Sequence, residues 1–262
     1  MDYYKDKICV ITGASTGIGY GLGVKLLEYG AARVYFTART QSTLDEAKAR
    51  LAPYGERAQF LSVDVTDPEA VKELIARAVR ENGRIDFLFN NAGIGQGGPT
   101  ERASLRAWER VVNTNLWGVI YGVNAVLPVM LEQGFGHIVN TASIQGLVPA
   151  PYQTLYSTTK HAVVGLSESL RLEMKSRNIQ VSVLCPGAVE SEIFHKGGGE
   201  TPKGAITAEY SAEWSLERIA RHQCTITVAE AADELHRLYR KDPEGPELES
   251  ALVSFGKSIG VY

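Results

Sequence analysis

The sequence is poor in cysteine, with three in 262 residues. Cys9, Cys185 and Cys224 show no paired spacing, and the first two lie in apolar runs where a reduced cysteine behaves as a small hydrophobic side chain. The five histidines are scattered, and no pair has the i, i+4 spacing of zinc ligands on a helix. We therefore expect neither a disulfide framework nor a metal site.

Long apolar runs and basic clusters are also missing. No window holds about 18 uninterrupted apolar residues, and the opening "MDYYKDK" is charged where a signal peptide needs an apolar segment. The formal net charge is −3 and the pI about 6.0, which gives no basic field for a nucleic acid. We expect a cytoplasmic protein with neither a membrane nor a nucleic acid as partner.

What the sequence does contain is a regular alternation of short apolar runs and amphipathic segments. The apolar runs are "ICVIT", "RVYFTA", "AQFLSVDV", "IDFLFNNAG", "HIVNTAS" and "QVSVLCPG", and the segments between them span 17–29, 42–52, 68–82, 104–133 and 153–177. Strands that alternate with helices and lack hairpin signals pair in parallel through right-handed crossovers. The pattern predicts an α/β fold, a single-domain Rossmann-type doubly wound parallel sheet with helices on both faces, over residues 1–262.

The regularity weakens after residue 191. We expect a helix over 209–222 and another from Thr227, as its N-cap, to Arg240. The glycine-rich patch "KGGGETPKG" at 196–204 is the one biased segment, and no linker indicates a second domain.

The string "TGASTGIG" at residues 12–19 follows the first strand and opens the first helix. Gly13 permits a tight exit from the strand, Gly17 lets a pyrophosphate approach the backbone, and Gly19 lets the helix pack close to the sheet. The helix N-terminus offers free N–H groups and partial positive charge to an anion. An ordinary strand-to-helix turn is the alternative, but the position in the first βα unit favours a dinucleotide site that includes Ser15, Thr16 and Ile18.

The end of the second strand bears on which dinucleotide binds. An acidic residue there would bind a free ribose 2′-hydroxyl, whereas this chain has Arg39 and Thr40, which suit a 2′-phosphate. The alternative is an arginine on a solvated loop. We expect NADP(H) to be preferred over NAD(H).

Tyr156 and Lys160 lie one turn apart on one face of the predicted helix 153–177. Alone this spacing is weak, but the chain also carries "TGASTGIG", "NNAG" at 90–93, "NTNL" at 113–116, Ser143, "YSTTK" and "CPG" in the order of the short-chain dehydrogenases/reductases, which it resembles over about residues 7–191. A free tyrosine has a pKa of about 10, and a neighbouring ammonium favours the phenolate and lowers that value. We expect Tyr156 to act as general acid or base and Lys160 to tune it.

The resemblance implies further roles for residues at matching positions. Ser143 would hydrogen-bond the substrate oxygen, Asn115 would support a water-linked proton path, and Lys160 would also hold the nicotinamide ribose. Ser143 and Asn115 could alternatively be polar residues at the ends of a strand and a helix, and the "NNAG" asparagines could satisfy backbone groups. The remaining dinucleotide-binding positions that the resemblance implies are Asp64, Val65, Asn90, Asn91, Ala92, Gly93, Tyr156, Pro186, Gly187, Val189 and Ser191.

Two segments are expected to shape the substrate pocket. Residues 190–227 would form a substrate-binding loop or lid that carries Phe194 and Trp214, although an ordinary surface helix explains its aromatic residues equally well. The other wall would be 144–155, with Gln145, Tyr152 and Gln153 as candidate contacts, and its apolar character predicts a hydrophobic substrate.

These observations predict an NADP(H)-dependent oxidoreductase that interconverts a secondary alcohol and a ketone, on a steroid-like or other bulky substrate. One alternative is a 3-oxoacyl thioester reductase of the same family, and another is a non-catalytic NADP-binding regulator. By resemblance we expect a homodimer or homotetramer.

Overall fold

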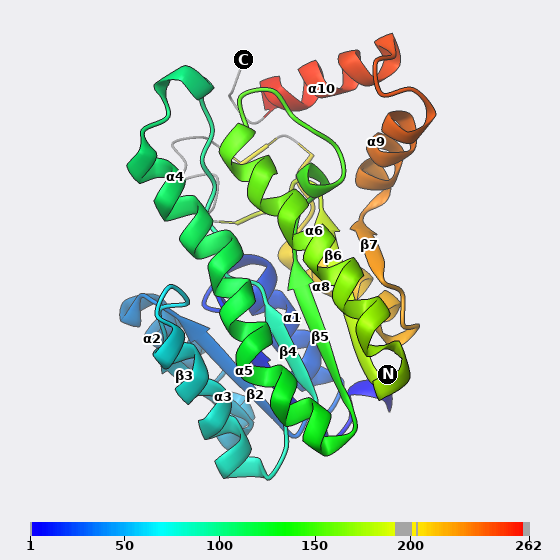
Figure 1. Cartoon of the computed structure of the whole chain (residues 1–262). Coiled ribbons are helices and arrows are strands. Elements are labelled where there is room, and N and C mark those ends of the chain that lie inside the picture. Colours follow the sequence, from blue (N-terminus) through cyan, green and yellow to red (C-terminus); the bar gives the residue numbers. More distant parts are fainter. Residues whose placement is uncertain (1, 192–200, 203, 259–262) are drawn as a thin grey trace.

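The computed structural model describes residues 2–191, 201–202 and 204–258, and within them the chain forms a seven-stranded parallel sheet with helices on both faces (Figure 1). The strand order is β3-β2-β1-β4-β5-β6-β7. The strands are β1 Ile8–Ile11, β2 Arg33–Ala38, β3 Ala58–Ser62, β4 Phe87–Asn90, β5 Gly136–Thr141, β6 Ile179–Pro186 and β7 Thr225–Val228. The doubly wound parallel sheet expected from the sequence is confirmed.

Most helices follow the predicted segments, although 104–133 holds two of them and α10 was not predicted. They are α1 Gly17–Glu28, α2 Gln41–Arg50, α3 Pro68–Asn82, α4 Leu105–Val112, α5 Gly118–Gln133, α6 Thr154–Met174, α8 Ala208–Ala220, α9 Glu230–Lys241 and α10 Pro246–Ser258. Local signals explain their ends; for example, the Asp67 carboxylate caps α3 by accepting from two backbone N–H groups, and Gly83 ends it in the left-handed region.

Both faces of the sheet are buried. On one face Leu22 of α1 and Leu216 of α8 pack against β-strand side chains such as Phe36. On the other face the side chains of Leu74 in α3 and Val126 in α5 enclose a second cluster. Because water reaches neither side, the strands consist of nearly continuous apolar residues.

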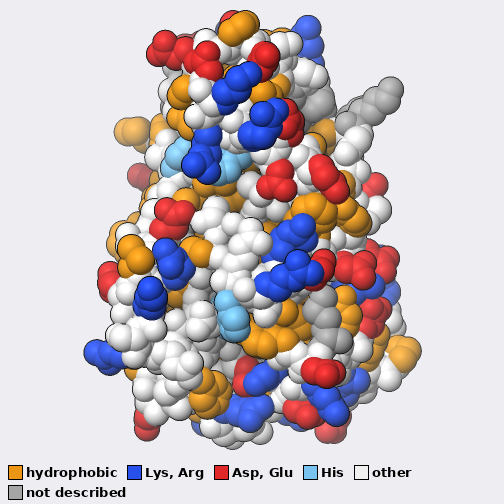
Figure 2. Space-filling model, turned by 90° about the vertical axis from the view of Figure 1, so that its right-hand side faces the viewer, with side chains coloured by type: hydrophobic (Ala, Val, Ile, Leu, Met, Phe, Trp, Pro, Cys, Tyr) orange, Lys and Arg blue, Asp and Glu red, His pale blue; other side chains and the backbone are white. Residues whose placement is uncertain are grey.

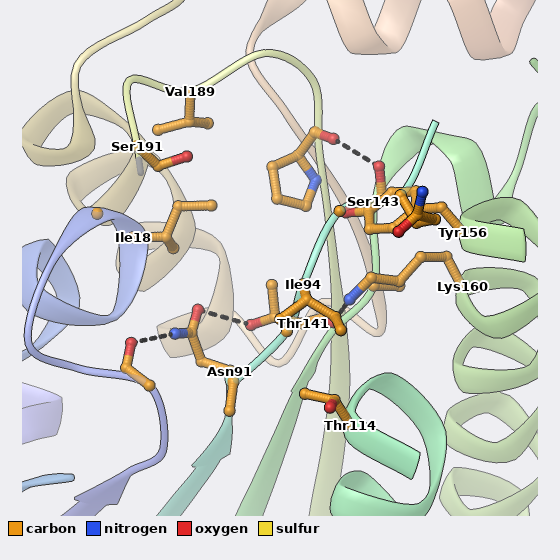
Figure 3. Close-up of a pocket in the computed structure, with 18 of the residues that line it drawn as sticks. Ile18, Asn91, Ile94, Thr114, Thr141, Ser143, Tyr156, Lys160, Val189 and Ser191 are labelled. Atoms are coloured by element: carbon orange, nitrogen blue, oxygen red, sulfur yellow. Dashed lines mark hydrogen bonds between the residues drawn. The ribbon is translucent and has the colours of Figure 1, made fainter. Parts of the chain in front are cut away.

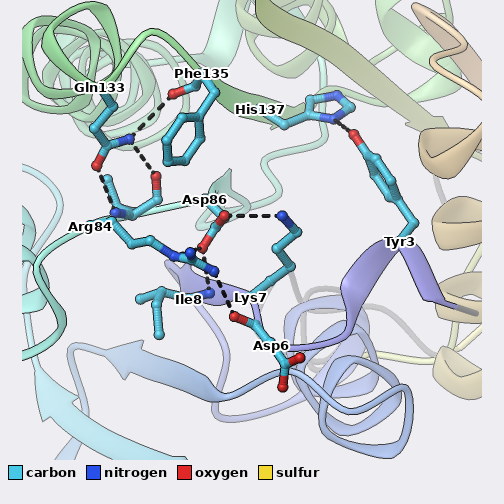
Figure 4. A network of polar contacts seen from close by, with 10 residues as sticks. Tyr3, Asp6, Lys7, Ile8, Arg84, Asp86, Gln133, Phe135 and His137 are labelled. Atoms are coloured by element: carbon cyan, nitrogen blue, oxygen red, sulfur yellow. Dashed lines mark hydrogen bonds and ion pairs between the residues drawn. The ribbon is translucent and has the colours of Figure 1, made fainter.

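The amino ends of the central strands are held by a buried polar network (Figure 4). Asp86 accepts from the backbone N–H of Ile8 at 2.9 Å, from Arg84 at 3.0 Å and from Lys7 at 3.3 Å. Nearby, the buried His137 contacts the Tyr3 hydroxyl through Nδ1 and Ser182 through Nε2. These contacts fix the strands at the end of the sheet opposite to the cavity described below.

The C-terminal part departs from the sequence-based prediction. Thr227 is not a helix N-cap but lies in β7, which the prediction omitted, and α9 begins at Glu230 after Ala229. The Thr227 hydroxyl instead contacts the Asp233 carboxylate in the first turns of α9. A four-residue strand carries too little pattern to be distinguished from the start of a helix, which explains the error.

Charges of both signs are interspersed on the surface over β7 and α9 (Figure 2). The helical stretch Leu105–Gln133, which includes α4 and α5, is long and apolar enough to cross a membrane by length and composition alone. Its inner side chains, such as Val126 and Met130, pack into the core of the sheet, and core helices of soluble proteins pass the same test.

Candidate active site

A cavity of about 750 Å³ opens at the carboxyl ends of the strands, next to the neighbouring strands β1 and β4, where the strand order reverses. Ligands of doubly wound sheets bind at this switch point. The cavity brings together most of the predicted residues, which come from distant parts of the chain (Figure 3). Those that line it are Gly13, Ser15, Thr16, Gly17, Ile18, Arg39, Thr40, Asp64, Val65, Asn91, Ala92, Gly93, Ser143, Gln145, Gln153, Tyr156, Lys160, Pro186, Gly187, Val189 and Ser191.

The glycine loop is shaped as a dinucleotide site requires. Gly13 has a φ of +64°, and a Cβ there would lie 2.7 Å from the Ala92 Cα. Gly19 does not line the cavity; a Cβ on it would lie 2.4 Å from the Asn91 Nδ2 atom, so its role is close packing. Helix α1 has no side-chain cap at Thr16, which leaves its first N–H groups free toward the cavity. These residues fit the pyrophosphate of a nicotinamide dinucleotide.

A second group of residues lies at the carboxyl ends of β2 and β3. Arg39 and Thr40 are exposed on the cavity wall, and Arg39 has no carboxylate partner among the described residues. Thr43 also lines the cavity here, and its hydroxyl donates to the Ser15 hydroxyl at 3.0 Å. The sequence analysis missed Thr43 because it lies inside α2. The group presents a cation and hydroxyls, with no acidic residue at the end of β2.

Asn91 connects the glycine loop to the centre of the cavity. Its Nδ2 donates to the carbonyl oxygens of Thr12 at 3.1 Å and Gly13 at 2.9 Å, and its Oδ1 accepts from the Thr141 hydroxyl at 3.3 Å (Figure 3). The Thr141 carbonyl in turn accepts from the Lys160 ammonium at 2.9 Å. The neighbouring Asn90 points into the core, where it donates to Asn140.

Tyr156, Lys160 and Ser143 converge on the cavity beside this chain of contacts (Figure 3). The Lys160 Nζ atom lies 5.4 Å from the centroid of the Tyr156 ring, and its side chain is buried. An ammonium has three N–H donors, and one is used among the described residues, so two remain for a ligand. Ser143 follows β5, and its hydroxyl donates to the Pro186 carbonyl at 3.4 Å.

Burial has the largest effect on the pKa values of Tyr156 and Lys160. Burial raises the pKa of Tyr156 to about 12, and the contact that lowers this pKa is a hydrogen bond with Ser143. Burial also lowers the pKa of Lys160 to about 8, because desolvation disfavours its charged form. Lys160 donates to the Thr141 carbonyl at 2.9 Å, and its Nζ atom lies beside the Tyr156 ring, so the tuning of the phenol by the lysine stays a prediction.

Asn115 lies behind the cavity wall rather than on it. It is fully buried in the π-helical turn Asn113–Trp117, between α4 and α5. Its side chain accepts from the Ile94 N–H at 2.8 Å and donates to the Ile94 carbonyl at 2.9 Å. A Cβ on Gly93 would lie 3.4 Å from the Asn115 Oδ1 and 3.5 Å from the Lys160 Nζ, so only a glycine separates the two side chains.

Of the predicted substrate contacts, Tyr152 and Trp214 do not line the cavity. Tyr152 is 40% exposed with a φ of +59°, and it does not line the cavity. Trp214 lies in α8, where its indole N–H donates to the Thr227 carbonyl and Arg218 stacks on its ring. Phe194 lies outside the described residues. Ala212 and Ile219 of α8 pack into the core, so residues 208–220 form a packed helix, and the lid over 190–227 stays a prediction.

The segment 144–155 does not form the expected apolar wall. Val148 and Leu155 are buried away from the cavity, and Val148 packs with Leu248 of α10. From this segment Ile144, Gln145 and Gln153 reach the cavity. Lining residues that the sequence analysis did not name include Ile94, Gln96, Arg110 and Thr114, of which Thr114 lies within "NTNL" and the other three lie in no motif.

The chain is similar to known oxidoreductases over most of its length. Residues 7–200 match the family model described as short chain dehydrogenase. An uncharacterised oxidoreductase of Staphylococcus saprophyticus is 37% identical over 223 residues, which cover 84% of this chain and 89% of the relative. A 3-oxoacyl-[acyl-carrier-protein] reductase of Thermotoga maritima is 34% identical over 190 residues, which cover 72% and 77% of the two chains.

Solved structures share the fold. A short chain dehydrogenase/reductase from Burkholderia phymatum in complex with NAD has a TM-score of 0.85 and 29% identity, with 93% of this chain and 96% of that chain covered. A short chain dehydrogenase from Burkholderia cenocepacia in complex with NADP has a TM-score of 0.82 and 25% identity, with 95% and 98% covered. The same fold therefore carries either dinucleotide.

Proposed function

The chain belongs to the short-chain dehydrogenase/reductase family and is an oxidoreductase, and we propose that it uses NADP(H) to interconvert a secondary alcohol and a ketone. The observation that carries this proposal is the convergence of Ser143, Tyr156 and Lys160 on a cavity that continues to the glycine loop. A protein that merely bound the dinucleotide would have no use for a phenol and a lysine buried together at that place.

The described side chains suit the proton transfer of such a reaction. Hydride transfer at the carbon is the chemistry that a bound nicotinamide supplies. In reduction, Tyr156 donates its phenolic proton to the carbonyl oxygen as negative charge develops there, and the Ser143 hydroxyl donates a hydrogen bond to the same oxygen. The Lys160 ammonium stabilises the phenolate left behind, and Asn115 holds the backbone of Ile94 beside it. Oxidation of the alcohol reverses these steps.

The preference for NADP(H) is supported by the residues that follow β2. Arg39 and Thr40 lie on the cavity wall, and an acidic residue that would repel a 2′-phosphate is missing from this position. The related structures divide between NAD and NADP, so the proposal depends on these two residues of the chain itself.

The function is tested by NADPH consumption with a panel of ketones, read at the absorbance band of the reduced nicotinamide. We expect turnover by the natural sequence and a fall of about 10²- to 10⁴-fold in kcat for Tyr156→Phe, because a general acid contributes that much. NADPH binding, measured by fluorescence, serves as the folding control for the variant. Undiminished turnover in Tyr156→Phe would show that Tyr156 is not the general acid. NADPH binding by the natural sequence without turnover of any ketone would favour a non-catalytic regulator.

A 3-oxoacyl thioester reductase is the second candidate, because the Thermotoga maritima relative is described as acting on such substrates. An acetoacetyl thioester in the ketone panel separates this candidate from the first. Preference for the thioester over simple ketones by a large factor in kcat/KM would select it.

We also propose a homodimer or homotetramer that associates through the outer faces of α5 and α6. Leu172 of α6 is 63% exposed and Trp117, beside α5, is 44% exposed, which is unusual for large apolar side chains. Light scattering should give a multiple of the 28.5 kDa chain mass. Leu172→Glu should lower that mass, and a monomer in the natural sequence would contradict the proposal.

A further inference from the structure

Two glutamine side chains that line the cavity are almost completely buried. Gln145 is 6% exposed and Gln153 is 8% exposed, yet both line the cavity next to the proposed catalytic residues. Gln145 lies two residues after Ser143, in the 3-10 turn that follows β5. Gln153 lies three residues before Tyr156, at the start of α6.

Neither carboxamide is satisfied by the protein. One end of Gln145 is engaged by the Ser157 hydroxyl at 3.3 Å, and its other end has no hydrogen-bond partner among the described residues. The Gln153 side chain makes no hydrogen bond there, and it does not cap α6. Among the described residues, three side-chain atoms lack both a hydrogen-bond partner and contact with solvent: Asn90 Oδ1, Arg171 Nε and Ser211 Oγ. The amide atoms of Gln145 and Gln153 are not among them, so their free atoms remain open to the cavity.

Such groups disfavour a purely apolar ligand. A lipophilic molecule that filled this part of the cavity would remove the last water from both carboxamides without replacing their hydrogen bonds, which is unfavourable. The uncapped N-terminus of the 21-residue helix α6 adds partial positive charge at the position of Gln153. The surroundings therefore favour an oxygen acceptor on the ligand.

Resting on the proposed function, we propose that Gln145 and Gln153 bind a second oxygen group of the substrate. The substrate is then a ketone, or the corresponding alcohol, with a carboxyl-derived group close to the reacting carbon: a carboxylate, an ester or a thioester. Three residues, about 4.5 Å along the helix axis, separate Gln153 from Tyr156, which suits an oxygen a few bonds from the reacting carbonyl. This substrate class differs from the steroid-like substrate expected from the sequence.

The test compares ketones that differ in the second group. Acetoacetate, ethyl acetoacetate and the N-acetylcysteamine thioester of acetoacetate carry it in three forms, and 2-pentanone lacks it. In Gln145→Met and in Gln153→Met we expect kcat/KM for at least one of the first three to fall by about 10- to 100-fold, chiefly through KM, as expected for loss of a ligand hydrogen bond. Turnover of 2-pentanone should stay within about twofold, as should all activities of Gln59→Met, a matched change outside the cavity.

The pattern among the three compounds shows which form is the natural one, since the preferred form should lose most. An equal loss for 2-pentanone would mean that the glutamines support the fold or the reaction itself, and no loss for any compound would mean that they do not touch the substrate. Either result overturns the subsite.

A binding experiment separates this subsite from the proposed reaction. The complex of Tyr156→Phe with NADPH is titrated calorimetrically with acetoacetate, its ethyl ester and its thioester. If the preferred compound binds and an added Gln153→Met weakens its binding by about tenfold or more, the subsite stands even where the natural sequence reduces no ketone. If the natural sequence reduces ketones but neither glutamine substitution weakens ligand binding, the proposed reaction is supported and the proposed subsite is wrong.

Discussion

Individual side chains at the cavity have distinct electrostatic tasks. Burial raises the pKa of the Tyr156 phenol, so the phenol is protonated when a carbonyl substrate binds. The low pKa of Lys160 reflects the cost of burying an ammonium, and a ligand that accepts from its two free N–H donors would favour the charged form. The ligand and the lysine therefore stabilise each other.

The Arg39 side chain is expected to select the dinucleotide. In Arg39→Asp we expect KM for NADPH to rise by about 10- to 100-fold, because a partly screened attraction to the 2′-phosphate is replaced by repulsion. KM for NADH should change little or fall. Steady-state kinetics with both dinucleotides measures this, with Arg50→Asp as a control on the same side of the molecule and outside the cavity lining. An unchanged preference for NADPH would show that Arg39 does not contact the phosphate.

Among the elements, α10 supports the turn that carries Gln145. Leu248 is 3% exposed and packs in one cluster with Ile144, which lies in that turn, and with Val148, which follows it. Leu248→Ala should destabilise the protein by about 2 kcal/mol, at the low end for a buried leucine. It should also raise KM for the substrate more than it lowers kcat, since the turn loses its support.

Chemical denaturation and steady-state kinetics measure the two effects of Leu248→Ala. Leu105→Ala is the control, because Leu105 is 80% exposed. A loss of stability with unchanged KM would show that α10 supports the fold without positioning the turn.

The elements also show what the sequence could and could not predict. The longer strands and the amphipathic helices were predicted because their apolar pattern is dictated by burial between layers, and the Tyr156–Lys160 pair because helical spacing places both on one face. The sequence could not predict which residues of 144–155 face the cavity. Val148 turns away only because α10, more than 90 residues later, covers it, and such long-range packing leaves no local pattern.

At the scale of the whole molecule, stability in acid should depend on the buried His137. Burial, with the nearby His222, lowers its pKa from 6.5 to about 3. Between these values the unfolded chain binds a proton that the folded protein does not, so stability is present above pH 6.5 and decreases as the pH falls through this window. The slope for one proton is about 1.4 kcal/mol per pH unit.

In His137→Gln the free energy of unfolding should therefore fall less steeply from about pH 6.5 to about pH 4 than in the natural sequence. Urea denaturation at a series of pH values measures the two slopes. His161→Gln, a change at an exposed histidine, should keep the steeper slope. Equal slopes in all three proteins would mean that His137 is not the group that binds the proton on unfolding.

Ser143 follows β5 and Tyr156 lies in α6, while both cavity glutamines belong to the connection between Ser143 and Tyr156. The proposed substrate-binding glutamines therefore lie in a connecting segment, whereas the proposed proton donor lies in a helix of the fold. Natural or designed variants could therefore bind a new substrate through changes in this connecting segment alone, and the reaction would stay the same.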